Sequence, residues 1–343
     1  MANGQDMNDF RTRRATVKDV ARLAGVSPGT VSNALSGARA VDRETRQRVE
    51  AAVAELGYVP NLAARHFRTG LSNTLAVMTS MPPAVSAGSS KLGFLMEVAA
   101  SAAISALEHN ATLVLVPPIA DPETALRNVV MDGAILIEPA QSDPFLDLLT
   151  RRGVPVVVIG QPPRDDLPWI DMHYRQTADL LIGHLLQQPT RCMPLLIGAS
   201  ARASHAEAEA VYLERMAATG LPCHVIRIPE AAGEEGARQA MHALIRELPD
   251  LDAVFASVDA FATGVMCALR EAGRAVPQQV RVATRYDGLR AREERPALTA
   301  TNLHLDAVAG LAIDRLMDLL AGRPAPLRVE GPLPVLVPRG SSA

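Results

Sequence analysis

Residues 16–37 read TVKDVARLAGVSPGTVSNALSG, and this stretch predicts two short helices joined by a tight turn. Thr16 and Ser27 are residue types that cap helix N-termini, and Pro28 occupies the first helical position, where its missing N–H costs nothing. Gly25 supplies the turn between the two helices. Two short helices joined by a glycine-containing turn form a helix-turn-helix.

Apolar residues recur at helical spacing on both sides of this turn and in a third segment that begins at Asp42 and ends at Gly57. The expected inward-facing residues are Val17, Val20, Ala21, Ala24, Val31, Leu35, Val49, Ala52, Val53 and Leu56. A generic three-helix bundle would show the same periodicity, so the pattern alone does not establish a DNA-binding head.

The residues themselves are more specific than the periodicity. Residues 16–37, then Thr-Arg-Gln-Arg-Val-Glu-Ala-Ala-Val-Ala-Glu-Leu-Gly-Tyr-Val-Pro-Asn at 45–61 and Ala64-Arg65, closely resemble the DNA-binding head of the lac repressor (LacI) family of bacterial transcription regulators. The resemblance implies that the helix over residues 27–36 enters the major groove of operator DNA.

The resemblance also implies which residues contact DNA. Asn33 is the expected reader of bases because its amide can pair with adenine, whereas Ser27, Thr30 and Ser32 are expected at phosphates. A hinge helix after Pro60 should enter the minor groove, with Phe67 where the family has a wedging leucine; a packing role for Phe67 is the alternative. The full expected set is Thr16, Ser27, Pro28, Gly29, Thr30, Ser32, Asn33, Tyr58, Asn61, Leu62, Ala64 and Phe67.

The charge of the chain is divided unevenly. The net charge is −3, but residues 1–70 hold 11 Lys and Arg against 7 Asp and Glu, giving +4, so the rest carries −7. A basic head on an acidic body is typical of a separate nucleic-acid-binding module, although a solvated face would also explain it. We expect a flexible arm at 1–15, the helix-turn-helix at 16–60 and a hinge with its linker at 61–73.

Beyond residue 73, β-rich runs alternate with helical patterns, which predicts an α/β body with parallel sheets. The expected strands are 75–79, 111–116, 133–138, 155–159, 194–197, 223–228, 253–256, 281–284 and 335–337. The expected helices are 93–109, 144–152, 174–187, 206–220, 233–247, 260–273 and 306–321.

This body resembles the family's periplasmic-binding-protein-like effector domain of two Rossmann-like lobes, here 74–343. The first lobe should hold 74–171 and 302–325, and the second 172–300 and 326–343, with hinge crossings near Asp171, Thr301 and Ala325. Ligands of such folds bind in the crevice at the carboxyl ends of the strands. The candidate effector-binding residues are Phe94, Asp171, Phe255, Asp259, Arg285 and Asp287.

The residues expected in the pocket differ from those of the sugar-binding members of the family. Gly160 stands where they commonly have an aspartate, and residues 204–212 lack their arginine. A sugar needs several polar side chains that hydrogen-bond its hydroxyl groups, so the absence of these two argues against an ordinary hexose as the effector. Arg285 would favour an anionic or aromatic effector. Loss of small-molecule control is the alternative.

The sequence lacks the residue patterns that are typical of other functional classes. The chain has three cysteines, Cys192, Cys223 and Cys267, and no CxxC motif, so we expect reduced thiols rather than disulfides. No histidine or cysteine cluster, P-loop, GxGxxG or GxSxG is present, so no metal, cofactor or catalytic residue is expected. No apolar run of 18 residues and no secretory signal is found, so a cytoplasmic protein is expected. Residues 336–341, LVPRGS, read as a thrombin recognition sequence.

Taken together, the sequence predicts a homodimeric, sequence-specific transcription regulator, most simply a repressor, whose affinity for a palindromic operator is controlled by a small molecule between the lobes. A solute-binding receptor fits the body alone but not the head. An enzyme on a Rossmann-like scaffold lacks catalytic residues.

Overall fold

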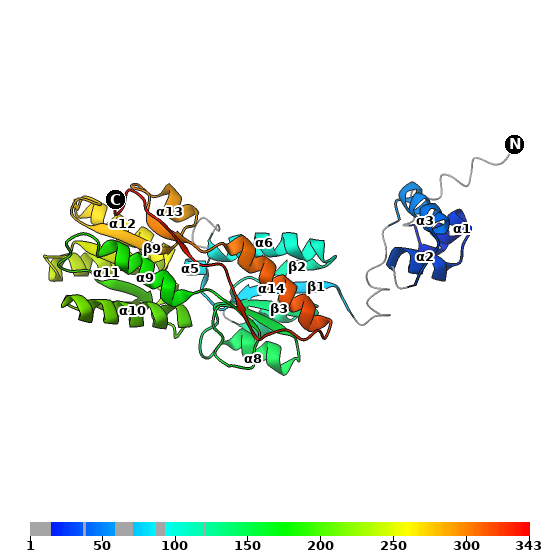
Figure 1. Ribbon diagram of the computed structural model, residues 1–343, viewed down its shortest axis with the longest axis horizontal. Coiled ribbons are helices and arrows are strands. Elements are labelled where there is room, and N and C mark those ends of the chain that lie inside the picture. The colour runs from blue at the N-terminus through cyan, green and yellow to red at the C-terminus, as the bar shows by residue number, and fades with distance from the viewer. Residues whose placement is uncertain (1–14, 37–38, 59–70, 87–92, 120) are drawn as a thin grey trace. The chain divides into compact units, whose positions relative to one another are not determined.

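The computed structural model describes residues 15–36, 39–58, 71–86, 93–119 and 121–343. They fall into two compact units, Met1–Ser72 and Asn73–Ala343, each of which is described by itself. The first unit is helical and the second is built on two sheets (Figure 1).

The helical unit consists of α1 (Val17–Ala24), α2 (Pro28–Ser36) and α3 (Arg43–Leu56). Its core consists of small and β-branched side chains: Val20, Ala21, Ala24, Val31, Val49 and Ala52. The prediction that Leu35 faces inward is wrong, because this side chain is 39% exposed. Ala34 packs against the core instead.

The helix ends follow from their capping residues. The carboxylate of Asp19 accepts hydrogen bonds from the backbone N–H and the hydroxyl of Thr16, at 3.0 and 2.6 Å. Gly25 ends α1 with φ +66°, in the left-handed region that glycine adopts without strain. The hydroxyl oxygen of Ser27 accepts the N–H of Thr30 at 3.1 Å, so α2 begins where the sequence predicts.

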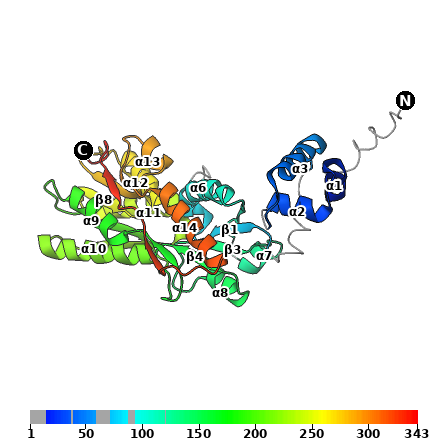
Figure 2. The ribbon, with the colours of Figure 1, turned by 45° about the vertical axis from the view of Figure 1, so that its right-hand side comes forward.

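The first lobe of the second unit is a parallel sheet in the order β11-β5-β4-β3-β1-β2. Its strands are β1 (Thr74–Thr79), β2 (Thr112–Leu115), β3 (Gly133–Ile137), β4 (Val156–Ile159), β5 (Trp169–Asp171) and β11 (Arg328–Glu330). Helices α6 (Phe94–Glu108) and α14 (Leu305–Leu320) pack against each other, as do α7 (Pro122–Leu126) and α8 (Pro144–Arg151) (Figure 2).

The second lobe is a sheet in the order β12-β10-β9-β8-β6-β7, parallel except for the β10–β12 pair. Its strands are β6 (Leu195–Gly198), β7 (Val225–Ile228), β8 (Ala253–Ala256), β9 (Arg281–Tyr286), β10 (Thr299–Asn302) and β12 (Val335–Val337). Helices α9 (Tyr174–Leu185) and α10 (Ala203–Thr219) pack together, as do α11 (Gly233–Glu247) and α12 (Asp259–Glu271). The short elements α5 (Pro83–Ser86), η2 (Glu230–Ala232) and α13 (Leu289–Glu293) complete the unit.

The chain passes between the lobes after β5, after β10 and after β11. The last crossing differs from the expectation, since β11 pairs in parallel with β5 and therefore belongs to the first lobe. The boundary expected at residue 325 thus lies beyond Glu330, and the crossing is made by residues 331–334.

Candidate nucleic-acid interface and effector cleft

The start of α2 is open to solvent. Ser27, Pro28 and Gly29 are exposed, and Asn33 is half-buried one turn later on the same helix. The hydroxyls of Ser27 and Thr30 lie 2.9 Å apart, so they hydrogen-bond to each other while the Ser27 oxygen caps the helix. A capped, solvent-facing helix start of this kind can be laid against a base edge or a phosphate.

A buried ion pair crosses the space between the two lobes. Glu138 follows β3 of the first lobe, is 3% exposed and has a φ of +44°. Its carboxylate lies 2.8 Å from Nη2 of Arg285, at the end of β9, and accepts the hydroxyl of Ser204 at 3.1 Å. Burial opposes the charge of Arg285, but its interactions with Glu138, Tyr174 and Asp259 together outweigh burial and raise the pKa of the guanidinium.

A second arginine joins the lobes beside this pair. Arg202 donates from Nε and Nη2 to the two carboxylate oxygens of Glu230 at 2.8 and 3.0 Å. Its Nη1 donates to the carbonyl of Glu138 and to Ser80 in the first lobe. Burial alone would raise the pKa of Glu230, but hydrogen bonds from His205 and Arg202 lower it to about 2.

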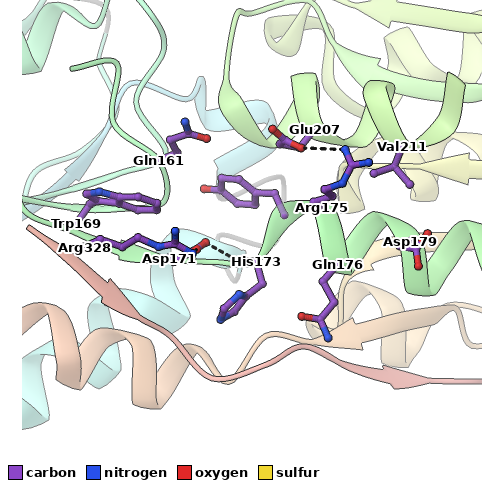
Figure 3. Close-up of a pocket in the computed structure, with 11 residues that line it drawn as sticks. Gln161, Trp169, Asp171, His173, Arg175, Gln176, Asp179, Glu207, Val211 and Arg328 are labelled. Atoms are coloured by element: carbon purple, nitrogen blue, oxygen red, sulfur yellow. Dashed lines mark hydrogen bonds and ion pairs between the residues drawn. The ribbon is translucent and has the colours of Figure 1, made fainter. Parts of the chain in front are cut away.

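An open groove of about 800 Å³ runs beside the first crossing (Figure 3). Trp169 and Asp171 line it from the first lobe, whereas Arg175 and Glu207 face one another from the second. The other lining residues are Gln161, His173, Tyr174, Gln176, Asp179, Val211 and Arg328. The volume lies in the range of small-molecule sites, and the lining offers many hydrogen-bonding groups.

Two family models match the chain. Residues 16–61 match bacterial regulatory proteins of the lacI family, and residues 182–342 match the periplasmic binding protein-like domain. The chain is 29% identical to the HTH-type transcriptional regulator CelR of Thermobifida fusca over 91% of this chain and 94% of that protein. These matches support a LacI-family transcriptional regulator with a periplasmic-binding-protein-like effector domain.

Other comparisons agree with these matches. The ribose operon repressor of Escherichia coli K12 is 29% identical over 96% of this chain and all of that protein. The solved lac repressor dimer bound to operator and the anti-inducer ONPF is 23% identical, covers 96% of this chain and 99% of that chain, and superimposes with a TM-score of 0.77. The chain is thus a DNA-binding transcriptional regulator, and both curated relatives are named for transcription rather than for a catalytic reaction.

The structure places the expected DNA-contacting residues of this LacI-family head in different settings. Pro28, Gly29 and Asn33 lie together along the start of α2, with Thr30 and Ser32 half-buried between them. The Thr16 hydroxyl is engaged by Asp19, and Tyr58 packs against the core of the head. Asn61, Leu62, Ala64 and Phe67 lie outside the described residues.

Three of the six expected effector residues come together between the lobes. The guanidinium carbon of Arg285 lies 5.7 Å from the ring centre of Phe94. Asp259 is 6% exposed at the start of α12; burial raises its pKa, and the charges of Arg290 and Arg285 oppose the rise. Since Glu138 already balances the charge of Arg285, this arginine does not favour an anionic effector.

The other three expected residues lie elsewhere. Asp171 lines the open groove. Phe255 is 1% exposed within the core of the second lobe, because its strand is covered on both faces, so it lines no cleft. Asp287 pairs with Arg292 at 3.4 Å and with Arg339 near the C-terminus. Its negative charge is therefore balanced by arginines outside the cleft.

Asp171, His173 and Glu330 bring ligand atoms within 4.8 Å of one another, the one such group of three or more metal-ligating side chains among the described residues. Arg328 lies 2.6 Å from Asp171 and 3.0 Å from Glu330, so both carboxylates already have a cationic partner. This arrangement explains the cluster without a metal ion.

Sequence reasoning missed the residues that close the cleft, namely Glu138, Tyr174, Arg202 and Glu230. One signal was available, since Glu138 is a carboxylate at the carboxyl end of an otherwise apolar strand. Across the described residues, no helix combines the length and the hydropathy that crossing a bilayer requires.

Proposed function

We propose that this regulator binds a palindromic operator as a homodimer and represses transcription, and that a small molecule between its lobes sets its affinity for DNA. The observation that carries the proposal is the capped, exposed start of α2 in a helix-turn-helix, attached to a two-lobed body. The lac repressor, which has the same fold, was solved as a dimer on its operator.

Asn33 is the proposed base reader, because its amide can donate to and accept from an adenine edge in the major groove. Pro28 and Gly29 let the backbone approach closely but offer no side-chain hydrogen bond. Binding-site selection with Asn33→Ala should relax the preferred half-site at one position and weaken binding by about 1–3 kcal/mol. Gln47→Ala, an exposed residue of α3, is the matched control; an unchanged half-site preference for Asn33→Ala would remove this assignment.

The proposed dimer surface lies on the first lobe. Ile104 and Leu107 of α6 are 65% and 70% exposed, and the edge strand β2 adds half-buried Leu113 and Leu115. Leucine and isoleucine exposed to this extent on one helix are typical of a surface that another chain covers. Leu107→Asp should raise the dimer dissociation constant at least about tenfold in sedimentation experiments, whereas Leu213→Asp, on α10, should not. Equal dimer dissociation constants for the parent and Leu107→Asp would argue against this surface.

The groove beside the first crossing is the proposed effector site. Asp171 and Arg175 come from different lobes, so a ligand that bridges them would stabilise one relative lobe position over another. Its carboxylate, amide and guanidinium lining suits a polar ligand with several hydrogen-bonding groups. A thermal-shift screen of metabolites with the full chain should give hits that Gln176→Ala weakens. Hits that bind the variant equally well would place the site elsewhere.

A further inference from the structure

Arg285 lies in surroundings that resemble those of a bound cation. Its guanidinium carbon is 5.7 Å from the Phe94 ring centre and 5.6 Å from the Tyr174 ring centre, and its Nη2 is 2.8 Å from Glu138. Two aromatic faces and one carboxylate around a guanidinium form the arrangement by which proteins recognise organic cations. We call Phe94, Tyr174 and Glu138 the cation cage.

The cage is assembled mainly by the lobe that does not carry Arg285. Phe94 begins α6 and Glu138 follows β3, both in the first lobe, whereas Arg285 ends β9 in the second. Tyr174 begins α9, and its hydroxyl occupies the space that a Cβ at Gly160 of the first lobe would fill, 1.9 Å away. The side chain of Arg285 therefore spans the cleft and binds to the opposite lobe.

The hydrogen bonds of Arg285 are incomplete, unlike those of Arg281 on the same strand. Nε and Nη1 of Arg285 are buried without a hydrogen-bond partner. Arg281, four residues earlier, donates to the carbonyls of Leu185 and Pro189 and to the hydroxyl of Thr190, all within its own lobe. Arg281 thus has the contacts of a structural arginine, whereas Arg285 has those of an occupant held by charge and ring faces.

We propose that the cation cage is a binding site for guanidinium-type cations and that Arg285 fills it as a ligand built into the chain, which favours the closed cleft. A free cation must compete with a tethered group whose effective concentration is in the millimolar range. The parent protein should therefore bind such cations at least about tenfold more weakly than a protein without Arg285. The consequence for operator affinity rests on the proposed function, whereas the experiment below measures the lobes without DNA.

The test uses Arg285→Ala in the full chain, with methylguanidinium as the probe cation. The distance between the lobes is followed by energy transfer between exposed Cys223 in the second lobe and an Asp147→Cys label on α8 of the first, after Cys192 and Cys267 are replaced by serine. Arg285→Ala should lengthen and broaden the distance, and millimolar methylguanidinium should restore it. In the parent and in Arg281→Ala, the distance should not respond to methylguanidinium at the same concentration.

Two results would overturn the proposal. An unchanged distance in Arg285→Ala would show that Arg285 does not favour closure. A longer distance that methylguanidinium fails to shorten would show that the cage does not bind the free cation. If Arg285→Ala folds poorly, Glu138→Gln in the parent removes the carboxylate of the cage and should lengthen the distance without any rescue by the cation; an unchanged distance there would also contradict the proposal.

Discussion

The buried carboxylate of Glu230 should make the stability of the second unit depend on acid in a defined way. Glu230 is 4% exposed and accepts hydrogen bonds from Arg202 and, at 3.1 Å, from His205. These partners hold its pKa at about 2, against 4.5 for a free glutamate. At about 1.4 kcal/mol per unit of pKa, the difference corresponds to about 3 kcal/mol of folding free energy.

The direction follows from the lowered pKa. Because the folded protein binds the proton more weakly than the unfolded chain, the stabilisation is complete above about pH 4.5 and is lost as the pH falls toward 2. Glu230→Gln removes the titrating group and leaves Arg202 buried beside a neutral amide. The variant should therefore be about 3 kcal/mol less stable at pH 7, and the gap should close in acid.

The assay is urea unfolding of the full chain at one protein concentration, from pH 7 down to pH 3. The other carboxylates titrate alike in the parent and in Glu230→Gln, so their contribution cancels in the difference between the two unfolding free energies. Glu235→Gln is the control, since that glutamate is exposed and water screens its ion pair with Arg238, so the substitution should change the pH dependence of stability little. A gap between parent and Glu230→Gln that stays constant from pH 7 to pH 3 would refute the reasoning.

Further predictions follow from glycine positions and from the C-terminal segment. Gly160→Ala should destabilise by about 3 kcal/mol or more in urea unfolding, because φ is +95° and the new Cβ would lie 1.9 Å from the Tyr174 hydroxyl. Gly153→Ala, with φ +64° and no atom within 4 Å, should cost only about 1–2 kcal/mol; equal losses would contradict the close approach. Thrombin should not cut after Arg339 in the native protein, because Ser341 is fully buried and accepts the N–H of Thr299 at 2.9 Å; rapid native cleavage followed by electrophoresis would contradict this packing.

Much of the head could be predicted because its signals are local. Caps at Thr16, Ser27 and Asp42 lie within three residues of the groups that they bond, so the sequence alone locates the helix starts. The prediction that Leu35 faces inward is wrong because α2 is short, and either Ala34 or Leu35 can continue the apolar face that begins at Val31. Which of them packs is decided by α1 and α3.

The cleft was harder to predict because its contacts join distant segments. Glu138 and Arg285 are far apart in the chain, and no local pattern couples a carboxylate after one strand to an arginine near the end of another. Strand β11 has three residues and finds its parallel partner β5 across the fold, so its lobe could not be assigned from periodicity. Phe255 is the penultimate residue of the apolar strand β8, and the sequence of the strand does not show whether its side chain points to the core or to a ligand.

The central claim is that this regulator reads DNA through the start of α2, and operator binding by the full chain measured against salt concentration tests it most directly. Anisotropy titrations with a selected palindromic duplex should give an affinity that falls with salt, with a slope of log K of about −0.9 for each phosphate contacted. Asn33→Ala should lower the affinity for that duplex while keeping the salt slope, because its loss affects base contacts rather than phosphate contacts. Binding without a salt slope, or an Asn33→Ala variant that binds the selected and a scrambled duplex as the parent does, would contradict the claim.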